Sequence, residues 1–416
     1  MSQSSTLLTA PGTTAGPAPG GHTPRPRRAG RLPATVAGPA VALGLFAAAR
    51  LTGLACVALA AHLTHQDTGR LLGQSWDSRW YTGIAAHGYG HTLRFGPDVV
   101  QSDLAFFPLY PGLVRAVAAV LPVGHATAGL LLSWLAAGAA ACGLYAIGER
   151  LHGRRAATYL VLLWALLPHS VVLSLAYTEP LLTAFAAWSL YAVLTGRWLW
   201  AGALAALAGL ARPNGFAVAA AVCATAAYEL AVRIVRIARI KEERGRKVAH
   251  SLWTVAAGAA LAPLGWASYV LYVGIREGDP LHGYFAVQRG WGSRFDFGAG
   301  SLVFVKHLLR DGDKLVFPIA LVVVAVSLLL FALLLAGRAP LPLVAYTAVL
   351  VLVTVGGSGF FESKPRFLLP AFPLLIPPAL AMTRARSRSV HLVVCALAGL
   401  SLAYGTYLVT TARMPL

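Results

Sequence analysis

One acidic residue, Asp77, lies between two tryptophans in the stretch WDSRWY at residues 76–81. Tryptophan and tyrosine are common where a membrane span meets water, so an interfacial anchor beside a solvated carboxylate is one interpretation. The other interpretation is catalytic, because a carboxylate held among aromatic side chains in a partly desolvated loop suits a general base. The spacing alone leaves both interpretations open.

Further ionisable residues lie inside or next to apolar segments: Arg50, Glu179, Arg212, Glu362, Lys364 and Arg366. Such charges are costly in a membrane and usually face a cavity or a partner, although each one alone could be a structural ion pair. The topology predicted below places Asp77 toward the outer leaflet with four of them: Glu179, Arg212, Lys364 and Arg366. A carboxylate and several cations in one cavity would suit a phosphate-linked lipid, because arginine binds phosphate with a bidentate fork.

These residues are embedded in a very apolar chain. The 416 residues have a mean hydropathy of +0.66 and only 12% charged residues, and many apolar blocks approach the ~20 residues that span a bilayer. The net charge of +19 comes from 34 basic and 15 acidic residues. Four basic runs separate the apolar blocks: 25–31, 149–155, 233–247 and 384–388. This pattern is typical of cytoplasmic span ends and of contact with membrane lipids, and it argues against nucleic-acid binding.

Hydropathy and charge together predict an all-α, polytopic transmembrane helical bundle of about eleven spans, with the N-terminus inside. The spans are expected at 36–61, 126–148, 156–174, 178–195, 199–211, 214–235, 251–274, 314–336, 340–357, 367–382 and 390–411. A long first outer loop, 62–124, contains a short apolar stretch at 104–121, predicted to be interfacial or re-entrant. If this stretch crossed the membrane, the orientation of all later spans would be inverted, and three of the basic runs would lie outside the cell. The break at residues 212–214 is expected to line a cavity, where a broken membrane helix is tolerated.

Residues 1–34 are predicted to form a disordered cytoplasmic tail, and 35–416 a multi-span membrane domain. The four cysteines lie in apolar segments without paired spacing, and the twelve histidines show no metal-ligand spacing. His169, near Pro168, is predicted to be a packed or hydrogen-bonded histidine. No carboxylate cluster is evident to hold a metal, so no metal is predicted. Nucleotide-binding and nucleophile-elbow motifs are also absent from the sequence, and no cofactor is predicted.

Five sequence blocks, in order, resemble the PIG-V type of membrane mannosyltransferases: WDSRWYTGIAAHGY, AFFPLYPGLVR, AYTEPLL, GLARPNG and KPRFLLPAFPLL. The resemblance covers roughly residues 40–411. It implies a GT-C-like fold and the use of polyprenyl-phosphate sugars as donors. The eukaryotic member of the family adds a mannose to the glycosylphosphatidylinositol precursor, and bacteria carry homologues.

The resemblance also implies roles for matched residues. Asp77 matches the acidic residue that is the presumed catalytic base of the family. The other matched positions are Tyr177, Glu179 and Pro180, then Arg212 and Asn214, then Pro365 and Arg366. Two departures are Ser78, where alanine is more usual, and a long stretch after Tyr89 whose only acidic residues are Asp98 and Asp103. The full set predicted to bind substrate is Trp76, Arg79, Tyr177, Glu179, Arg212, Asn214, Gln288, Trp291, Lys364 and Arg366.

The sequence therefore predicts a glycosyltransferase of the cell membrane whose active site faces outside. Asp77 would activate a hydroxyl of a lipid, polymer or protein acceptor, which attacks a polyprenyl-phosphate mannose with inversion. The prediction that the transferred sugar is mannose rests on the resemblance, because arabinose, glucose or galactose donors would need similar phosphate-binding and carboxylate groups. Two alternatives remain: a flippase or transporter of a lipid-linked sugar, and a non-catalytic membrane scaffold.

Overall fold

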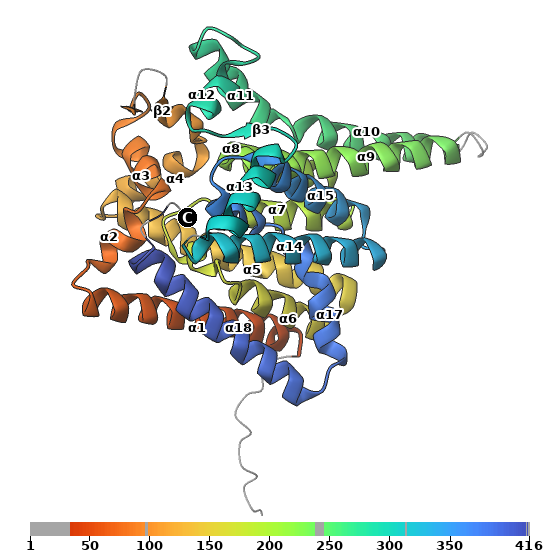
Figure 1. The fold of residues 1–416 in the computed structure, drawn as a ribbon. Coiled ribbons are helices and arrows are strands. Elements are labelled where there is room, and N and C mark those ends of the chain that lie inside the picture. Colours follow the sequence, from red (N-terminus) through yellow and green to blue (C-terminus); the bar gives the residue numbers. More distant parts are fainter. Residues whose placement is uncertain (1–33, 96–98, 238–244, 313, 413, 415–416) are drawn as a thin grey trace, which may run out of the picture. The chain divides into compact units, whose positions relative to one another are not determined.

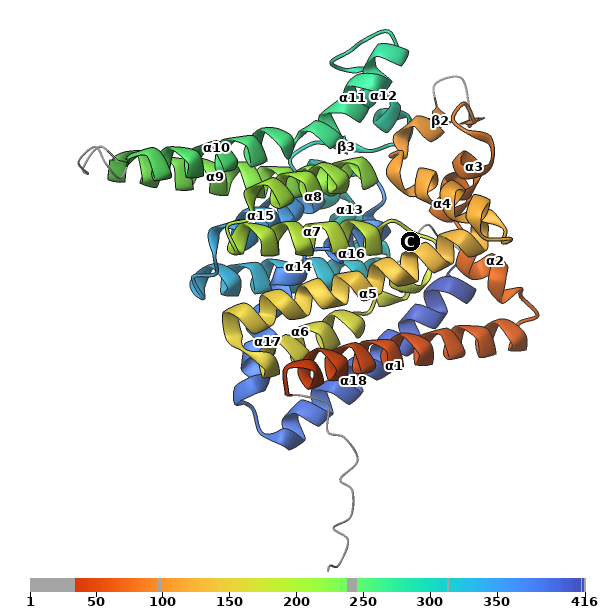
Figure 2. The ribbon, with the colours of Figure 1, turned by 180° about the vertical axis from the view of Figure 1, so that it is seen from behind.

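The computed structural model of the chain describes residues 34–95, 99–237, 245–312, 314–412 and 414. The predicted tail, 1–34, falls outside these residues except for Ala34, and so do residues 238–244 of the charged run at 236–250. The chain from Gly38 to Leu416 is one structural unit (Figures 1 and 2).

The described part of the chain starts with a long helix and continues through short elements of the first loop. The elements are α1 (Ala34–Leu63), α2 (Thr68–Gly73), α3 (Asp77–His87), β1 (Thr92–Arg94), β2 (Val100–Ser102), the 3-10 helix η1 (Asp103–Ala105) and α4 (Leu109–Val120). Strands β1 and β2 pair antiparallel, with Thr92 opposite Ser102. The predicted interfacial stretch 104–121 thus contains a helix of 12 residues, which is too short to cross a bilayer upright.

The middle of the chain forms a group of packed helices with breaks between them. These elements are α5 (His125–His152), α6 (Arg154–Ala165), η2 (Ser170–Ser174), α7 (Glu179–Leu194), α8 (Trp198–Ala211), η3 (Pro213–Gly215), α9 (Phe216–Ile237) and α10 (Gly245–Leu261). Helix α5 packs against α4, α6 and α7, and α8 packs against α7, α9 and α10.

The last part of the chain holds a second long loop and further long helices. Its elements are α11 (Leu264–Arg276), α12 (Gly283–Gly290), β3 (Arg294–Phe295), α13 (Ala299–Asp311), α14 (Val316–Ala336), α15 (Leu341–Gly356), β4 (Gly357–Ser358), η5 (Phe361–Ser363), α16 (Lys364–Leu368), η6 (Phe372–Leu375), α17 (Ile376–Arg384) and α18 (Ser387–Thr410). Helix α18 lies beside α1 in both views (Figures 1 and 2), where Gly53 faces Leu402.

The prediction of an all-α, multi-span membrane protein is confirmed. Among the described residues, six helical segments are long and apolar enough to span a membrane, or seven if the pair Phe361–Leu368 and Phe372–Arg384, bent by 75°, forms one span. Four further apolar helices are shorter: Leu109–Val120, Glu179–Leu194, Trp198–Ala211 and Leu341–Gly356. The predicted number of eleven is therefore not confirmed.

The predicted span 156–174 differs most from the structure, because its helix α6 already ends at Ala165. Pro168 follows, and proline cannot continue a helix without clashing with the preceding turn. The guanidinium of Arg50 lies against this break and donates to the carbonyls of Ala165 and Ser170, both at 2.6 Å. Arg50, predicted to face a cavity or a partner, thus satisfies carbonyl groups that the break leaves without helical donors.

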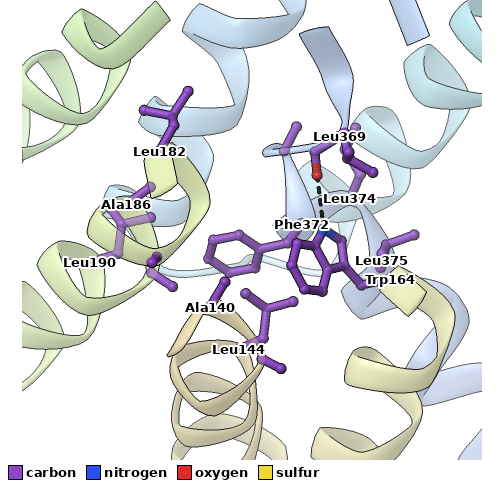
Figure 3. Close-up of a cluster of buried hydrophobic side chains, with 14 of the residues drawn as sticks. Ala140, Leu144, Trp164, Leu182, Ala186, Leu190, Leu369, Phe372, Leu374 and Leu375 are labelled. Atoms are coloured by element: carbon purple, nitrogen blue, oxygen red, sulfur yellow. Dashed lines mark hydrogen bonds between the residues drawn. The ribbon is translucent and has the colours of Figure 1, made fainter. Parts of the chain in front are cut away.

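A second break, at residues 369–371, bends the chain between α16 and η6. The buried Trp164 indole donates to the carbonyl of Leu369 at 3.1 Å (Figure 3). The buried Tyr346 hydroxyl donates to the carbonyl of Pro370 at 3.0 Å. Both side chains belong to the main hydrophobic core, together with Phe372. Since a buried carbonyl without a partner costs free energy, these donors favour one geometry of the bend.

Close helix approach supports the other break, at residues 212–214. Helix α8 crosses α10 where Gly202 faces Gly258, and a Cβ atom on either glycine would clash with the backbone of the other helix. Small residues at such a crossing let two helix backbones come together in a membrane. The close approach continues near the C-terminal end of α8, where Gly209 faces the backbone of Trp266 in α11, three residues before Arg212.

Removing one donor at the bend is expected to destabilise the protein. Tyr346→Phe keeps the packing of the ring but leaves the Pro370 carbonyl buried without its donor, at a cost of about 1–3 kcal/mol. Denaturant unfolding of the purified protein in detergent, followed by circular dichroism, measures this change. The control is Tyr159→Phe at a partly exposed tyrosine. Equal stability of the two variants would contradict a structural role for the Tyr346 hydroxyl.

Candidate active site

Asp77 is the first residue of α3, and the backbone leading into it is unusual. Trp76, which precedes it, has φ +47° and ψ −117°, a conformation that residues with a side chain rarely adopt. Strain of this kind persists only where surrounding contacts hold it, and it often occurs at functional sites. The ring of Trp76 packs against the main core, which supplies such a contact.

Glu179 also begins a helix, since it is the first residue of α7 and is followed by Pro180. Proline is favoured in the first turn of a helix, where its missing N–H is not needed. Both candidate carboxylates thus lie at helix N-termini, where the exposed N–H groups favour negative charge. The difference between them is access: the Asp77 side chain is 21% exposed, whereas that of Glu179 is 1% exposed.

The two arginines lie where helices are broken or very short. Arg212 has an extended backbone, φ −162° and ψ 153°, between the end of α8 and η3. Arg366 belongs to the five-residue helix α16, just before the bend at 369–371. Both side chains are 7% exposed. The predicted break at 212–214 is confirmed.

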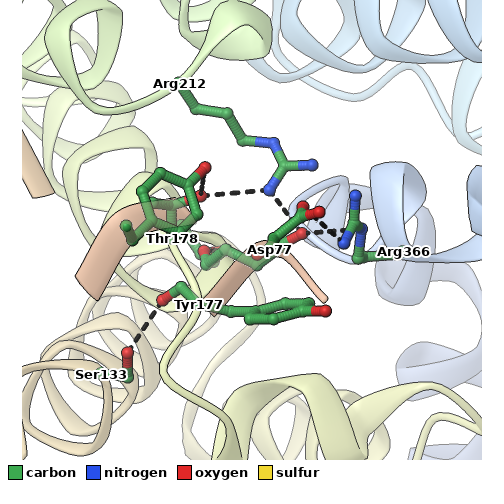
Figure 4. A network of polar contacts seen from close by, with 9 residues as sticks. Asp77, Ser133, Tyr177, Thr178, Arg212 and Arg366 are labelled. Carbon is green, nitrogen blue, oxygen red and sulfur yellow. Dashed lines mark hydrogen bonds and ion pairs between the residues drawn. The ribbon is translucent and has the colours of Figure 1, made fainter. Parts of the chain in front are cut away.

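The four side chains form one chain of ion pairs (Figure 4). Arg366 Nη1 lies 2.8 Å from Asp77 Oδ2, and its Nε lies 3.1 Å from Glu179 Oε1. Arg212 Nη1 lies 2.5 Å from the same Glu179 oxygen and donates to the Thr178 hydroxyl at 3.1 Å. Four segments far apart in the sequence therefore bring their charges to one place. We call these residues, Asp77, Glu179, Arg212 and Arg366, the charge network.

The charge network is not saturated with hydrogen bonds. Glu179 Oε1 and Oε2 and Arg366 Nε and Nη1 are buried and have no partner of hydrogen-bond geometry in the described structure. The contacts among them are ion pairs by distance alone. Buried polar groups are normally hydrogen-bonded, so the geometry of these four atoms is unusual.

Aromatic rings fix the two guanidinium groups from the side. Phe367 lies 5.5 Å from the guanidinium carbon of Arg212 and 5.3 Å from that of Arg366, and the Tyr177 ring lies 5.2 Å from the latter. Such stacking holds the guanidinium planes while leaving their edges for anions. Tyr177 is in turn held by the Ser133 hydroxyl, which donates to its carbonyl at 2.8 Å (Figure 4).

The hydroxyl of Tyr81, one turn beyond Asp77, lies 3.2 Å from that of Thr178. Burial raises the pKa of the Tyr81 phenol well above its usual value. The phenol is therefore protonated over the physiological pH range, and this contact ties α3 to the start of α7.

The remaining residues predicted to bind substrate have other contacts. The ammonium group of Lys364 donates to the carbonyls of Thr354 and Gly357, which fixes α16 to the end of α15. Gln288 Nε2 donates to Ala105 O at 3.3 Å and to the Tyr284 hydroxyl at 2.8 Å. These contacts hold the loops together and lie apart from the charge network.

Trp291 donates from its indole to Ser102 O at 2.9 Å and packs against Trp80 and Phe106. Asn214 is part of η3, directly after Arg212 and Pro213. Arg79 Nε donates to Gln74 O at 2.7 Å, on the exposed side of α3. Only Asp77, Glu179, Arg212 and Arg366 of the predicted set are joined by ion pairs, with Tyr177 stacked beside them.

Sequence reasoning missed Thr178 and Phe367 as members of the site. Both lie within the sequence blocks AYTEPLL and KPRFLLPAFPLL that resemble the family. However, the residue types threonine and phenylalanine do not by themselves indicate a contact with arginine. His169 is buried as predicted, but neither ring nitrogen has a hydrogen-bond partner in the described structure. Among the residues described, no group of three or more histidine, cysteine or acidic side chains could hold a metal ion.

Residues 47–254, half of the chain, match the family model described as Mannosyltransferase (PIG-V). The chain belongs to the PIG-V mannosyltransferase family. The predicted family and its enzyme class, a membrane glycosyltransferase, are thereby confirmed. The matched region contains three members of the charge network, and Arg366 lies beyond it.

The fold is also similar, at a distance, to archaeal oligosaccharyltransferases. The structure of the Archaeoglobus fulgidus enzyme in its apo form has 14% identity and a TM-score of 0.45, with 90% of this chain and 56% of that chain covered. The structure of AglB from the same organism, in complex with an inhibitory peptide and a dolichol-phosphate, has 12% identity, a TM-score of 0.45 and the same coverage. The chain thus spans just over half the length of these enzymes. No curated protein matches the sequence.

Removing the shared carboxylate should destabilise the whole network. Glu179→Gln leaves two buried guanidinium groups with one fewer counter-charge, and breaking a buried ion pair in this way costs about 3–5 kcal/mol. The matched control is Glu149→Gln, whose partner Arg154 is 49% exposed, and there the cost is about 0–1 kcal/mol. Denaturant unfolding in detergent compares the two variants. Equal stability would show that the charges are not coupled.

Proposed function

We propose that this protein transfers a mannosyl residue from a polyprenyl-phosphate-linked donor to an acceptor hydroxyl, with inversion at the anomeric carbon and Asp77 as general base. The observation that carries the proposal is the charge network, in which one partly exposed carboxylate lies 2.8 Å from a buried guanidinium group. A base and a phosphate-binding cation next to each other are the two groups that this reaction requires.

In the proposed step, Asp77 removes the proton of the acceptor hydroxyl as its oxygen attacks the anomeric carbon. The bond between that carbon and the phosphate oxygen breaks, and its electron pair leaves with the phosphate. The donor is a phosphodiester with one negative charge, and the leaving group is a phosphomonoester that gains a second. Catalysis therefore depends on stabilising charge that develops on the leaving phosphate.

Arg366 and Arg212 are the groups proposed to stabilise that charge. Their guanidinium groups are held by Glu179 Oε1 and by the ring of Phe367. The Nε and Nη1 atoms of Arg366 lie 3.1 Å from Glu179 Oε1 and 2.8 Å from Asp77 Oδ2, but neither contact has hydrogen-bond geometry. Phosphate oxygens would supply acceptors in the planar arrangement that arginine favours. Lys364, predicted from the sequence to share this role, is already bound to two carbonyls and acts instead through the position of α16.

Asp77 suits the role of base better than Glu179 because an acceptor must reach it. The Asp77 side chain is 21% exposed and that of Glu179 is 1% exposed. Glu179 also contacts both arginines, so its charge is needed to hold them together. We assign Glu179 to positioning and Asp77 to proton transfer.

The proposed setting is the cell membrane, with the N-terminus in the cytoplasm and the active site on the outer face. The basic runs at 149–155 and 384–388 follow apolar segments and, under the positive-inside rule, belong to the cytoplasmic side. In the topology predicted from the sequence, the segments that carry the charge network lie toward the outer leaflet. The acceptor hydroxyl belongs to a lipid, polymer or protein, and membership of the mannosyltransferase family supports mannose as the transferred sugar.

Asp77→Asn keeps the shape of the side chain but removes the base. Turnover with polyprenyl-phosphate mannose should fall by about 10²–10⁴. The control is Asp67→Asn, because Asp67 caps α2 with its carboxylate, touches no member of the charge network, and asparagine caps a helix about as well. Transfer of radiolabelled mannose in membranes containing each variant measures the effect. Full activity of inserted, folded Asp77→Asn would exclude Asp77 as the base.

The same substitution should strengthen binding of the product lipid. Without ligand, Asp77 occupies Arg366, and its negative charge opposes an incoming phosphate. Asp77→Asn is therefore expected to bind polyprenyl phosphate about tenfold more tightly than the wild type, whereas Asp67→Asn leaves the affinity unchanged. Equilibrium binding to purified protein in detergent measures this. Unchanged or weaker binding by Asp77→Asn would contradict phosphate binding at Arg366.

A further inference from the structure

A cavity of about 610 Å³ lies between α2 and α3, away from the charge network. We call it the α2–α3 groove, and its lining residues are Arg70, Leu71, Gln74, Ser75, Arg79, Thr82, Gly83, Ala86 and His87. Its volume is within the range of about 300–1,000 Å³ that small-molecule sites occupy. Neither the family match nor the proposed reaction gives it a role.

The charge of the α2–α3 groove is of one sign. Two arginines and one histidine line it, and its lining contains no carboxylate. Arg79 is anchored through Nε to Gln74 O at 2.7 Å, and its terminal nitrogens have no hydrogen-bond partner among the described residues. Neither Arg70 nor Arg79 makes an ion pair with any residue that the structure describes. Two guanidinium groups without counter-charges favour an anion with several oxygens.

The other lining residues suit a headgroup attached to an acyl chain. Ser75 and Thr82 contribute hydroxyls, and Leu71, Gly83 and Ala86 contribute apolar surface. The groove also lies beside a membrane span, because α2 begins at Thr68, just after α1, whose span ends at Leu63. A bilayer phospholipid is therefore the phosphate-bearing molecule nearest to this surface.

The groove and the charge network are on opposite faces of α3. With 3.6 residues per turn, Arg79, Thr82 and Ala86 share one face of the helix, and Asp77 and Tyr81 share the other. Tyr81 is buried against Thr178, whereas Arg79 is exposed. A ligand in the groove would thus hold α3 from outside without touching the catalytic carboxylate.

We propose that the α2–α3 groove binds the phosphate-bearing headgroup of an anionic bilayer phospholipid and thereby fixes the segment that carries Asp77 at the membrane surface. The phosphate would contact Arg70 and Arg79. This site is separate from the proposed donor site, and its test does not depend on the proposed function.

Native mass spectrometry of the purified protein in neutral detergent tests the proposal. The probes are phosphatidylglycerol and phosphatidylcholine, and the wild type should retain the anionic lipid in preference. The double variant Arg70→Gln and Arg79→Gln should lose at least about tenfold in phosphatidylglycerol affinity, since each guanidinium contact to a phosphate is charge-assisted. The matched control is Arg276→Gln with Arg289→Gln, two exposed arginines of the second long loop, which should change the affinity by less than about twofold.

A second variant blocks the space without altering charge. A Cβ atom added at Gly83 meets nothing within 4 Å, so Gly83→Leu should fold normally and project into the groove. It should weaken phosphatidylglycerol binding as the double variant does. Asp77→Asn should leave phosphatidylglycerol binding unchanged, which separates this site from the proposed active site.

Three outcomes would overturn the proposal. One is equal phosphatidylglycerol binding by the groove variants and the control. Another is displacement of the lipid by inorganic phosphate alone, which would indicate a site for a free anion. The third is displacement by polyprenyl phosphate in the wild type but not in an Arg366→Gln variant, which would place the bound phosphatidylglycerol at the charge network.

Discussion

The structure of the site depends on one guanidinium group, that of Arg366, held between two carboxylates. Its Nη1 lies 2.8 Å from Asp77 and its Nε 3.1 Å from Glu179. A buried charge in an apolar protein is tolerated only when it is paired, so each of these residues requires the others. The contacts also join α3, α7 and α16, which are far apart in the chain. Their coming together is thus a condition of folding as well as the basis of the proposed chemistry.

That charge can be buried only because the helices around it are interrupted. Arg212 and Arg366 both belong to backbone that leaves regular helix, and Asp77 and Glu179 begin helices. Each break leaves backbone carbonyl groups without helical hydrogen bonds, and buried side chains donate to them instead. Arg50 donates to the carbonyls of Ala165 and Ser170, Trp164 to that of Leu369, and Tyr346 to that of Pro370. The hydrophobic core in Figure 3 therefore supports the polar site in Figure 4.

Much of this could be predicted from the sequence, because charges in apolar segments are few and their placement is informative. Hydropathy located α1, α5, α9, α14 and α18, and the motif around Pro213 located the break beside Arg212. Hydropathy did not reveal that α6 ends at Ala165, since Leu166 to Leu175 are as apolar as a span. The sequence also could not show which of Lys364 and Arg366 belongs to the charge network, because both are cations and they are two residues apart. Only the fold shows that the ammonium group of Lys364 is bound to two backbone carbonyls. The stacking of Phe367 on two arginines needs three-dimensional contacts that no local pattern specifies.

The central claim is that the charge network cleaves a bond between a sugar and a lipid phosphate. The most direct test uses the purified wild-type protein, reconstituted into vesicles with polyprenyl-phosphate mannose labelled in the sugar and with total membrane lipids as acceptors. We expect release of polyprenyl phosphate together with a labelled product of the opposite anomeric configuration. Movement of the intact donor across the bilayer without cleavage would contradict glycosyl transfer and indicate a transporter.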